Sequence, residues 1–101
     1  MRRGTTPTLI FTIPYAASMI ESGFITFAQR GVVCLEKRID DEAVELDDYQ
    51  IQVFLTQNDT LAMTDAAELK IQIRLKLTKG IAVASQVMKT KVGEILKGGV
   101  I

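Results

Sequence analysis

The segment from Ala67 to Thr78 alternates between apolar and polar side chains at every second residue. Successive side chains of a β-strand point to opposite faces, so this segment has one apolar and one polar face. Such alternation is typical of an antiparallel sheet that packs on a core with one side and meets water with the other. The apolar positions are Leu69, Ile71, Ile73, Leu75 and Leu77; the polar positions are Glu68, Lys70, Gln72, Arg74 and Lys76.

Other segments show related patterns and turn signals. Pro7 and Pro14 bracket the first of them, and because proline cannot donate to a ladder we expect this strand to be short or at an edge. Arg30 and Gly31 predict a tight turn that joins two strands as a hairpin. A break in the alternation near Ser85-Gln86 predicts a bulge in the last strand. The further expected strands are residues 8–13, 24–30, 32–38, 44–46, 49–55 and 81–92.

These strands predict an all-β chain, one domain over residues 1–101 that forms a two-sheet antiparallel sandwich of about seven short strands. We expect an N-terminal arm at 1–7 and a C-terminal tail at 93–101, which forms either a helical turn or an extended arm. One helical turn is expected within residues 15–22. Another should start at Thr56, where an acid three residues later completes a capping box, and cross between the sheets. The inward side chains outside 69–77 are expected to be Leu9, Phe11, Ile13, Ile25, Phe27, Val33, Leu35, Tyr49, Ile51, Val53 and Leu55.

Catalytic chemistry has few candidate residues in this chain. There is no histidine and only one cysteine, Cys34. Most zinc and copper sites and the histidine-based triads are therefore excluded, and the thiol lacks its usual activating base. We interpret Cys34 as a small buried or half-buried strand residue. We expect no enzyme activity, no catalytic residues, no cofactor and no small-molecule substrate.

Six acidic residues gather in the segment 39–48. Hard cations bind several carboxylate oxygens at once, so a divalent-cation site is one interpretation of this cluster. The spacing fits no cation-binding loop, and the glycine that such loops use for their turn is absent. We therefore expect a solvated acidic face and no metal site.

The net charge is zero, but the charges are unevenly spread along the chain. Residues 1–35 have three cations and one acid, residues 36–68 two cations and ten acids, and residues 69–101 seven cations and one acid. The interpretation we favour is that neighbouring strands neutralise one another. The alternative is that the acidic part of one copy meets the basic part of another in a head-to-tail assembly.

Two classes of partner are disfavoured by the sequence. A nucleic-acid surface would need a basic total or exposed aromatic side chains beside the basic segment, and neither is expected. No stretch approaches the ~20 apolar residues of a membrane span, and the start of the chain lacks the apolar run of a signal peptide. We expect no nucleic-acid partner, no membrane partner, and synthesis in the cytoplasm.

Five apolar residues are candidates for contacts with a partner. Phe54 should point outward from its strand among polar neighbours, either as a lid over a sheet edge or as part of a partner surface. Ile95, Leu96, Val100 and Ile101 give the tail an apolar character. The tail is a candidate contact with another copy or another protein, or alternatively a frayed or self-packed terminus.

The opening segment Arg2 to Ile13, Arg-Arg-Gly-Thr-Thr-Pro-Thr-Leu-Ile-Phe-Thr-Ile, resembles a group of small proteins from prophages of Gram-positive gut bacteria. Those proteins open with Gly-Thr-Thr-Pro-Thr and an alternating strand. The segment is also similar to the first strand of N-terminal modules of phage upper-baseplate proteins. The chain departs from the pattern at Ala16-Ala17 and in its more hydrophobic tail. Further similar segments are 25–29, 35–37, 55–61, 68–74 and 82–85.

The resemblance implies a virion component of a phage tail or baseplate with an immunoglobulin-like sandwich and no catalytic residues. We therefore expect a non-catalytic structural subunit that docks to itself, to other tail proteins, or to both. The alternative is a stand-alone immunoglobulin-like binding module for a carbohydrate or a cell-surface ligand. Such sites usually present aromatic platforms, and this chain has no tryptophan and only Tyr15 and Tyr49 as tyrosines.

Overall fold

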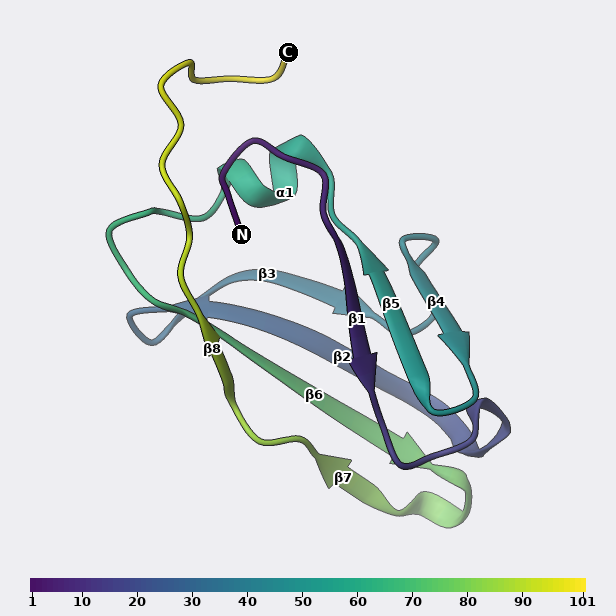
Figure 1. The fold of residues 1–101 in the computed structure, drawn as a ribbon. Helices are drawn as coiled ribbons and strands as arrows, with labels where there is room; N and C mark the ends of the chain where they lie inside the picture. The colour runs from purple at the N-terminus through teal and green to yellow at the C-terminus, as the bar shows by residue number, and fades with distance from the viewer.

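Two antiparallel sheets face each other in the computed structural model, which describes residues 1–101 (Figure 1). The smaller sheet has the strand order β1-β5-β4, and the larger has the order β3-β2-β6-β7 with β8 also paired to β6. The expected two-sheet sandwich with short helical turns is confirmed. The elements are β1 (Thr8–Thr12), the 3-10 turn η1 (Ala17–Met19), β2 (Ile20–Gln29), β3 (Val32–Arg38), β4 (Val44–Asp47), β5 (Gln50–Phe54), α1 (Gln57–Leu61), β6 (Leu69–Leu77), the 3-10 turn η2 (Thr78–Gly80), β7 (Ala82–Ala84) and β8 (Met88–Thr90).

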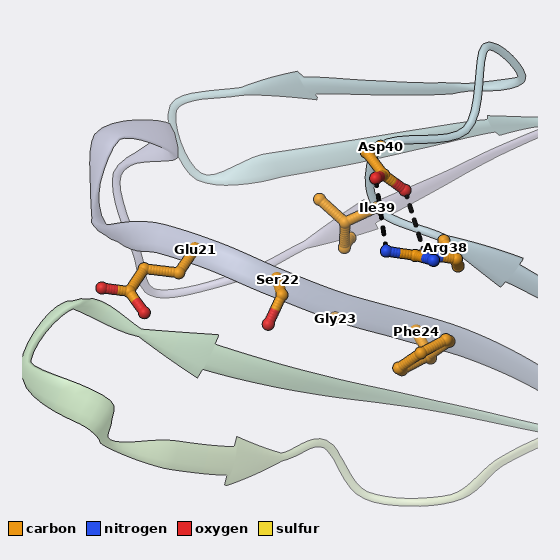
Figure 2. A pocket seen from close by; sticks show the side chains of 7 residues that line it. All are labelled: Glu21, Ser22, Gly23, Phe24, Arg38, Ile39 and Asp40. Atoms are coloured by element: carbon orange, nitrogen blue, oxygen red, sulfur yellow. Dashed lines mark hydrogen bonds and ion pairs between the residues drawn. The ribbon is translucent and has the colours of Figure 1, made fainter.

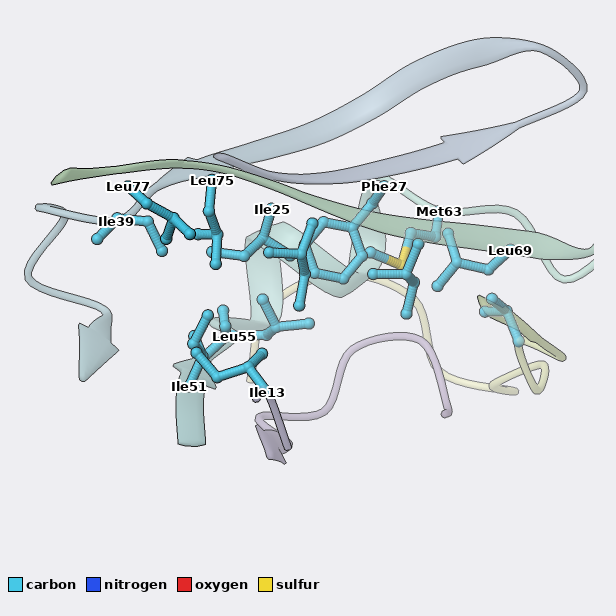
Figure 3. Close-up of a cluster of buried hydrophobic side chains, with 14 residues drawn as sticks. Ile13, Ile25, Phe27, Ile39, Ile51, Leu55, Met63, Leu69, Leu75 and Leu77 are labelled. Atoms are coloured by element: carbon cyan, nitrogen blue, oxygen red, sulfur yellow. The ribbon is translucent and has the colours of Figure 1, made fainter. Parts of the chain in front are cut away.

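Side chains from both sheets build the core. Ile25 and Phe27 of β2 and Leu69 of β6 are fully buried on one side, and Ile51 and Val53 of β5 are fully buried on the other. Figure 3 shows this cluster, with the side chains of the larger sheet facing those of the smaller one. The alternation of β6 is confirmed, because its five apolar side chains are all buried. The sequence patterns did not predict the buried side chains of Ile39, Thr60, Met63 and Val92.

The expected position of the first strand is also confirmed. β1 pairs only with β5 and forms one edge of the smaller sheet. Leu9 and Phe11 pack against the core, while Ile10 between them is 58% exposed. The prolines on either side thus bracket a strand that needs hydrogen bonds along one side only.

Two side chains expected in the core point outward instead. Val33 is 54% exposed, because the pairing of β2 with β3 shifts by one residue: Phe27 pairs with Leu35, and Ala28 pairs with Val33. The extra residue, Cys34, reverses the face on which Val33 lies. Tyr49 is 56% exposed because it belongs to the turn before β5, where its φ of 65° breaks the strand pleat.

The last expected strand is divided into two. β7 and β8 both pair with β6, and residues 85–87 separate them. Ser85 continues the ladder across this gap, since its N–H donates to the Ile73 carbonyl oxygen (2.8 Å) and its Oγ accepts from the Ile73 N–H (3.0 Å). The break lies where the sequence predicts a bulge, but three residues leave the strand.

The turns follow the expected chemistry. Arg30 and Gly31 both have positive φ, 53° and 77°, which is the geometry of a two-residue hairpin turn. Thr56 caps α1: its Oγ accepts from the Asp59 N–H (3.1 Å), and the Asp59 carboxylate accepts from the Thr56 N–H (2.9 Å). The capping box is confirmed, and α1 leads from the smaller sheet to the larger one.

Thr56→Ala is expected to lower the free energy of unfolding by about 1 kcal/mol, because it leaves the Asp59 N–H without its capping acceptor. Chemical denaturation followed by circular dichroism measures the change. Thr56→Ser keeps the hydroxyl and serves as the matched control. Equal loss of stability in the two variants would contradict the capping role.

The two ends of the chain lie side by side. Arg2 and Gly93 form a parallel bridge, in which the Gly93 N–H donates to the Met1 carbonyl oxygen (2.7 Å) and the Arg3 N–H to the Gly93 carbonyl oxygen (3.1 Å). Beyond Gly93 the tail is extended and runs past α1 (Figure 1). The side-chain amide of Gln57 holds the Ile101 backbone, accepting from its N–H (2.9 Å) and donating to its carbonyl oxygen (3.4 Å). None of the helices is long and apolar enough to cross a membrane.

Candidate interaction surfaces

The outer side of the larger sheet carries a row of cations. β6 points its apolar side chains into the core, so the alternate side chains of Lys70, Arg74 and Lys76 are exposed on the outer side. Neighbouring strands add two more cations. Arg38 of β3 and Arg74 both lie opposite Phe24 of β2, one on each side, and Lys89 of β8 lies directly opposite Lys70. We call this surface the basic face; its residues are Arg38, Lys70, Arg74, Lys76 and Lys89.

An exposed aromatic ring lies within the basic face. Phe24 is 42% exposed and has Arg38 opposite it on β3 and Arg74 opposite it on β6. The Arg38 guanidinium carbon is 6.0 Å from the centre of the ring, at the limit of a cation–π contact. A phenylalanine between two arginines combines the residue types that are enriched in the cores of protein interfaces.

A small hollow adjoins Phe24 (Figure 2). It has a volume of 110 Å³ and is lined by residues 21–24 of β2 and by Arg38, Ile39 and Asp40. Arg38 and Asp40 form an ion pair (Nε to Oδ1, 3.2 Å), but both side chains are largely exposed, so the pair adds little stability. The hollow is well below the roughly 300–1,000 Å³ of a typical small-molecule site.

The outer side of the smaller sheet is acidic. Glu45 and Asp47 point outward from β4, opposite Gln52 and Gln50 of β5, and no lysine or arginine lies on any of its three strands. The turns that adjoin β4 add the exposed acids Asp41, Glu42 and Asp48, whereas Asp40 pairs with Arg38 at the hollow beside Phe24. All six acids of 39–48 are exposed to solvent, as expected. We call this surface the acidic face; its residues are Asp41, Glu42, Glu45, Asp47 and Asp48.

Apolar side chains also occur on the acidic side. Ile10 lies opposite Gln52, and Phe54 lies opposite Thr8, which makes Ile10 and Phe54 diagonal neighbours across the β1–β5 pair. They are 58% and 41% exposed, respectively. The outer side of the larger sheet thus combines mostly cations, with Glu36 of β3 as an exposed acid among them, with the exposed ring of Phe24, and the outer side of the smaller sheet combines acids with Ile10 and Phe54.

Most of these charges have no partner within the chain. The structure has two ion pairs, Lys37–Asp59 and Arg38–Asp40, both at 3.2 Å. Lys70, Arg74, Lys76 and Lys89 form none. The favoured expectation that neighbouring strands neutralise one another is therefore wrong for β6, because no acid is its direct partner on β2, β7 or β8.

The five interface candidates lie on two parts of the molecule. Phe54 is on the acidic side of the smaller sheet. Leu96, Val100 and Ile101 of the tail are 98%, 60% and 91% exposed. Ile95 is only partly exposed; its Cδ1 approaches the backbone of Gly4 in the N-terminal arm. Ile95 therefore packs on its own chain, and the other four remain open to solvent.

The two tyrosines do not form an aromatic platform. The Tyr49 N–H donates to the Tyr15 carbonyl oxygen (3.0 Å), which brings the two residues together. Tyr15 packs against the core, however, and only Tyr49 is well exposed. A single exposed tyrosine offers little of the stacking surface that a carbohydrate-binding module usually presents.

Cys34 is half-buried, as expected, at the shifted position of β3. Its thiol donates to the Phe27 carbonyl oxygen (3.4 Å). Burial raises the pKa of the Cys34 thiol, and a backbone hydrogen bond offsets part of this effect. No group of three or more cysteine and acidic side chains is arranged to hold a metal ion.

Alkylation of Cys34 by iodoacetamide is expected to be slower in the folded chain than in the urea-unfolded chain at the same mildly alkaline pH. The reason is that a raised pKa leaves a smaller fraction of the reactive thiolate. The rate measured against pH should have its midpoint at higher pH when the chain is folded. A folded-state midpoint below that of the unfolded chain would show that the thiol is activated.

The sequence shows that charge is unevenly spread along the chain, but it does not predict that the charges gather on a basic and an acidic face. Which strands lie side by side decides where those charges gather, and that order is a property of the fold. The exposed position of Phe24 follows from the register of β2 with its two neighbours.

Comparison of the chain with protein-family models, with curated proteins and with solved structures finds no match.

Proposed function

We propose that this chain is a non-catalytic structural subunit of a phage or prophage tail or baseplate, which works by docking its outer faces on other protein surfaces. One observation carries the docking proposal. The two outer sides of the sandwich have opposite charge, their charges are mostly unpaired, and each side exposes a phenylalanine.

The basic face is unfavourable in an isolated chain. Lys70 and Lys89 are directly opposite each other on neighbouring strands, an arrangement in which like charges destabilise a sheet. Arg38 and Arg74 flank the same Phe24. An anionic protein surface would offset this repulsion and cover the Phe24 ring. The clustered cations, which are unfavourable in the free chain, would therefore be stabilised when a partner is bound.

The place in a virion is supported by the resemblance of residues 2–13, and of the further segments, to prophage proteins and baseplate modules. Subunits of such particles assemble through protein–protein contacts. The exposed tail residues Leu96, Val100 and Ile101 offer a third contact region besides the two faces.

The proposal is tested on particles of the phage or prophage that encodes the chain. Particles are purified from an induced culture and digested for quantitative mass spectrometry, and an antibody against the chain locates it by immunogold microscopy. We expect the chain at a copy number comparable to that of the tail proteins, with label at the tail or baseplate. Its absence from particles, when the lysate contains it, contradicts the proposal.

A glycan array distinguishes the binding-module alternative. With one exposed tyrosine and no tryptophan, we expect no specific signal. A reproducible signal that is lost in Tyr49→Ala would favour the binding module instead.

A further inference from the structure

We infer that the two faces are complementary to each other, so that the basic face of one copy docks on the acidic face of a second copy and the copies stack in one direction. The inference rests on the proposed docking function and names the partner as the chain itself. It follows from where the fold places the two sets of charges.

Apart from the exposed Arg38–Asp40 pair at the end of β3, the charges of the two faces are not paired with each other within one molecule. They lie on opposite outer sides of the sandwich, with both sheets and the core between them (Figure 1). Facing sheets alone are ~10 Å apart, which is beyond the reach of an ion pair. A second copy, placed in the same orientation, brings its acidic face to the basic face of the first.

Both outer sides also present apolar groups that stacking could cover. The basic face presents Phe24, and the acidic side presents Ile10 with Phe54 as its diagonal neighbour. Stacking would remove these three side chains from water and leave the charges around them. Interfaces are commonly built in this way, with an aromatic anchor inside a polar rim.

The contact is heterologous, because each copy uses two different surfaces. A face of three strands at ~4.8 Å spacing and about five residues at ~3.3 Å is small and covers a few hundred Å² per partner. Standard interfaces bury about 800 Å² per partner, so a single contact should be weak, in the micromolar range or weaker, and sensitive to salt. Copies held close together in a particle would bind one another more tightly overall, because the weak contact is repeated many times.

The test reverses two charged side chains of one face at a time. The first variant combines Arg74→Glu with Lys76→Glu and cancels most of the positive charge of the basic face. The second combines Glu45→Lys with Asp47→Lys and cancels most of the negative charge of the acidic face. All four side chains are exposed and none is in an ion pair, so both variants should fold, which circular dichroism checks.

Sedimentation velocity at low salt then measures self-association. We expect the unmodified chain to associate, each variant alone to bind itself at least tenfold more weakly, and an equimolar mixture of the two variants to recover association. The recovery is the decisive result, because a variant that had merely lost its fold could not be rescued by the other.

Charge-matched controls separate the faces from the total charge. Lys79→Glu with Lys97→Glu changes the net charge as the first variant does, and Asp65→Lys with Glu94→Lys changes it as the second does, all at exposed positions outside both faces. Both controls should associate like the unmodified chain. Phe24→Ser should weaken association about tenfold without loss of the fold.

Three outcomes would overturn the inference: an unmodified chain that is monomeric up to ~1 mM, self-association that survives in both reversed variants, or a mixture that does not recover. These outcomes are distinct from failure of the proposed function. A monomeric chain that is nevertheless found in particles would refute stacking and leave the structural role intact. A chain that stacks but is absent from particles would refute the structural role and leave stacking intact.

Discussion

Gly23→Ala is expected to lower the free energy of unfolding by about 3 kcal/mol or more, since it forces a methyl group into a close contact between strands. A Cβ at this position would be 2.5 Å from the Arg74 carbonyl oxygen and 2.7 Å from the Leu75 Cδ2. The carbonyl belongs to β6, the strand that pairs with β2 through the middle of the larger sheet. It cannot move aside without disturbing that ladder, and a domain of this size has only about 5–15 kcal/mol of stability in total.

Gly98→Ala is the matched control for this variant. A methyl group added at Gly98 would meet no atom within 4 Å, and Gly98 lies outside the sheets, so its replacement should leave the unfolding midpoint nearly unchanged. Urea denaturation followed by circular dichroism compares the two proteins. Equal midpoints would mean that β2 and β6 leave room for a side chain at Gly23, against the close contact between them.

Phe27→Ala is expected to lower the free energy of unfolding by about 3–5 kcal/mol, because it removes the largest fully buried side chain of the core. Phe27 is on the inner side of β2 and packs in the cluster of Figure 3. The loss combines the transfer free energy of the ring with a cavity that the two sheets cannot fully close.

Two exposed phenylalanines provide the controls for Phe27. Phe24 and Phe54 are 42% and 41% exposed, on opposite outer sides of the sandwich. Phe24→Ala and Phe54→Ala should each cost less than about 1 kcal/mol in the same denaturation experiment. A cost of Phe54→Ala similar to that of Phe27→Ala would place Phe54 in the core, against the proposed docking role.

Local pattern was sufficient for much of the fold. The alternation of β6, the prolines around β1 and the capping box at Thr56 each depend on residues close in the sequence, and each predicted the observed element. These features follow from the period of a strand and from the hydrogen-bonding needs of a short helix.

The failures of prediction came from contacts between segments distant in the sequence. Val33 points outward because Cys34 is an extra residue relative to β2, and only the pairing of the two strands reveals that shift. The sequence patterns did not show that Gly23 lies within β2, where close approach of β6 leaves no room for a side chain. The charged faces likewise depend on strand order, which periodicity does not specify.

The salt dependence of self-association tests the complementary-face proposal most directly, with the unmodified chain and no substitutions. Sedimentation velocity is measured over a range of protein concentrations at ~50 mM and ~500 mM salt, between which the screening of exposed charges rises strongly. We expect the sedimentation coefficient to increase with concentration at low salt and to fall to that of a monomer at high salt. A chain that is monomeric under all conditions, or whose association is the same at both salt concentrations, would contradict docking through the two charged faces.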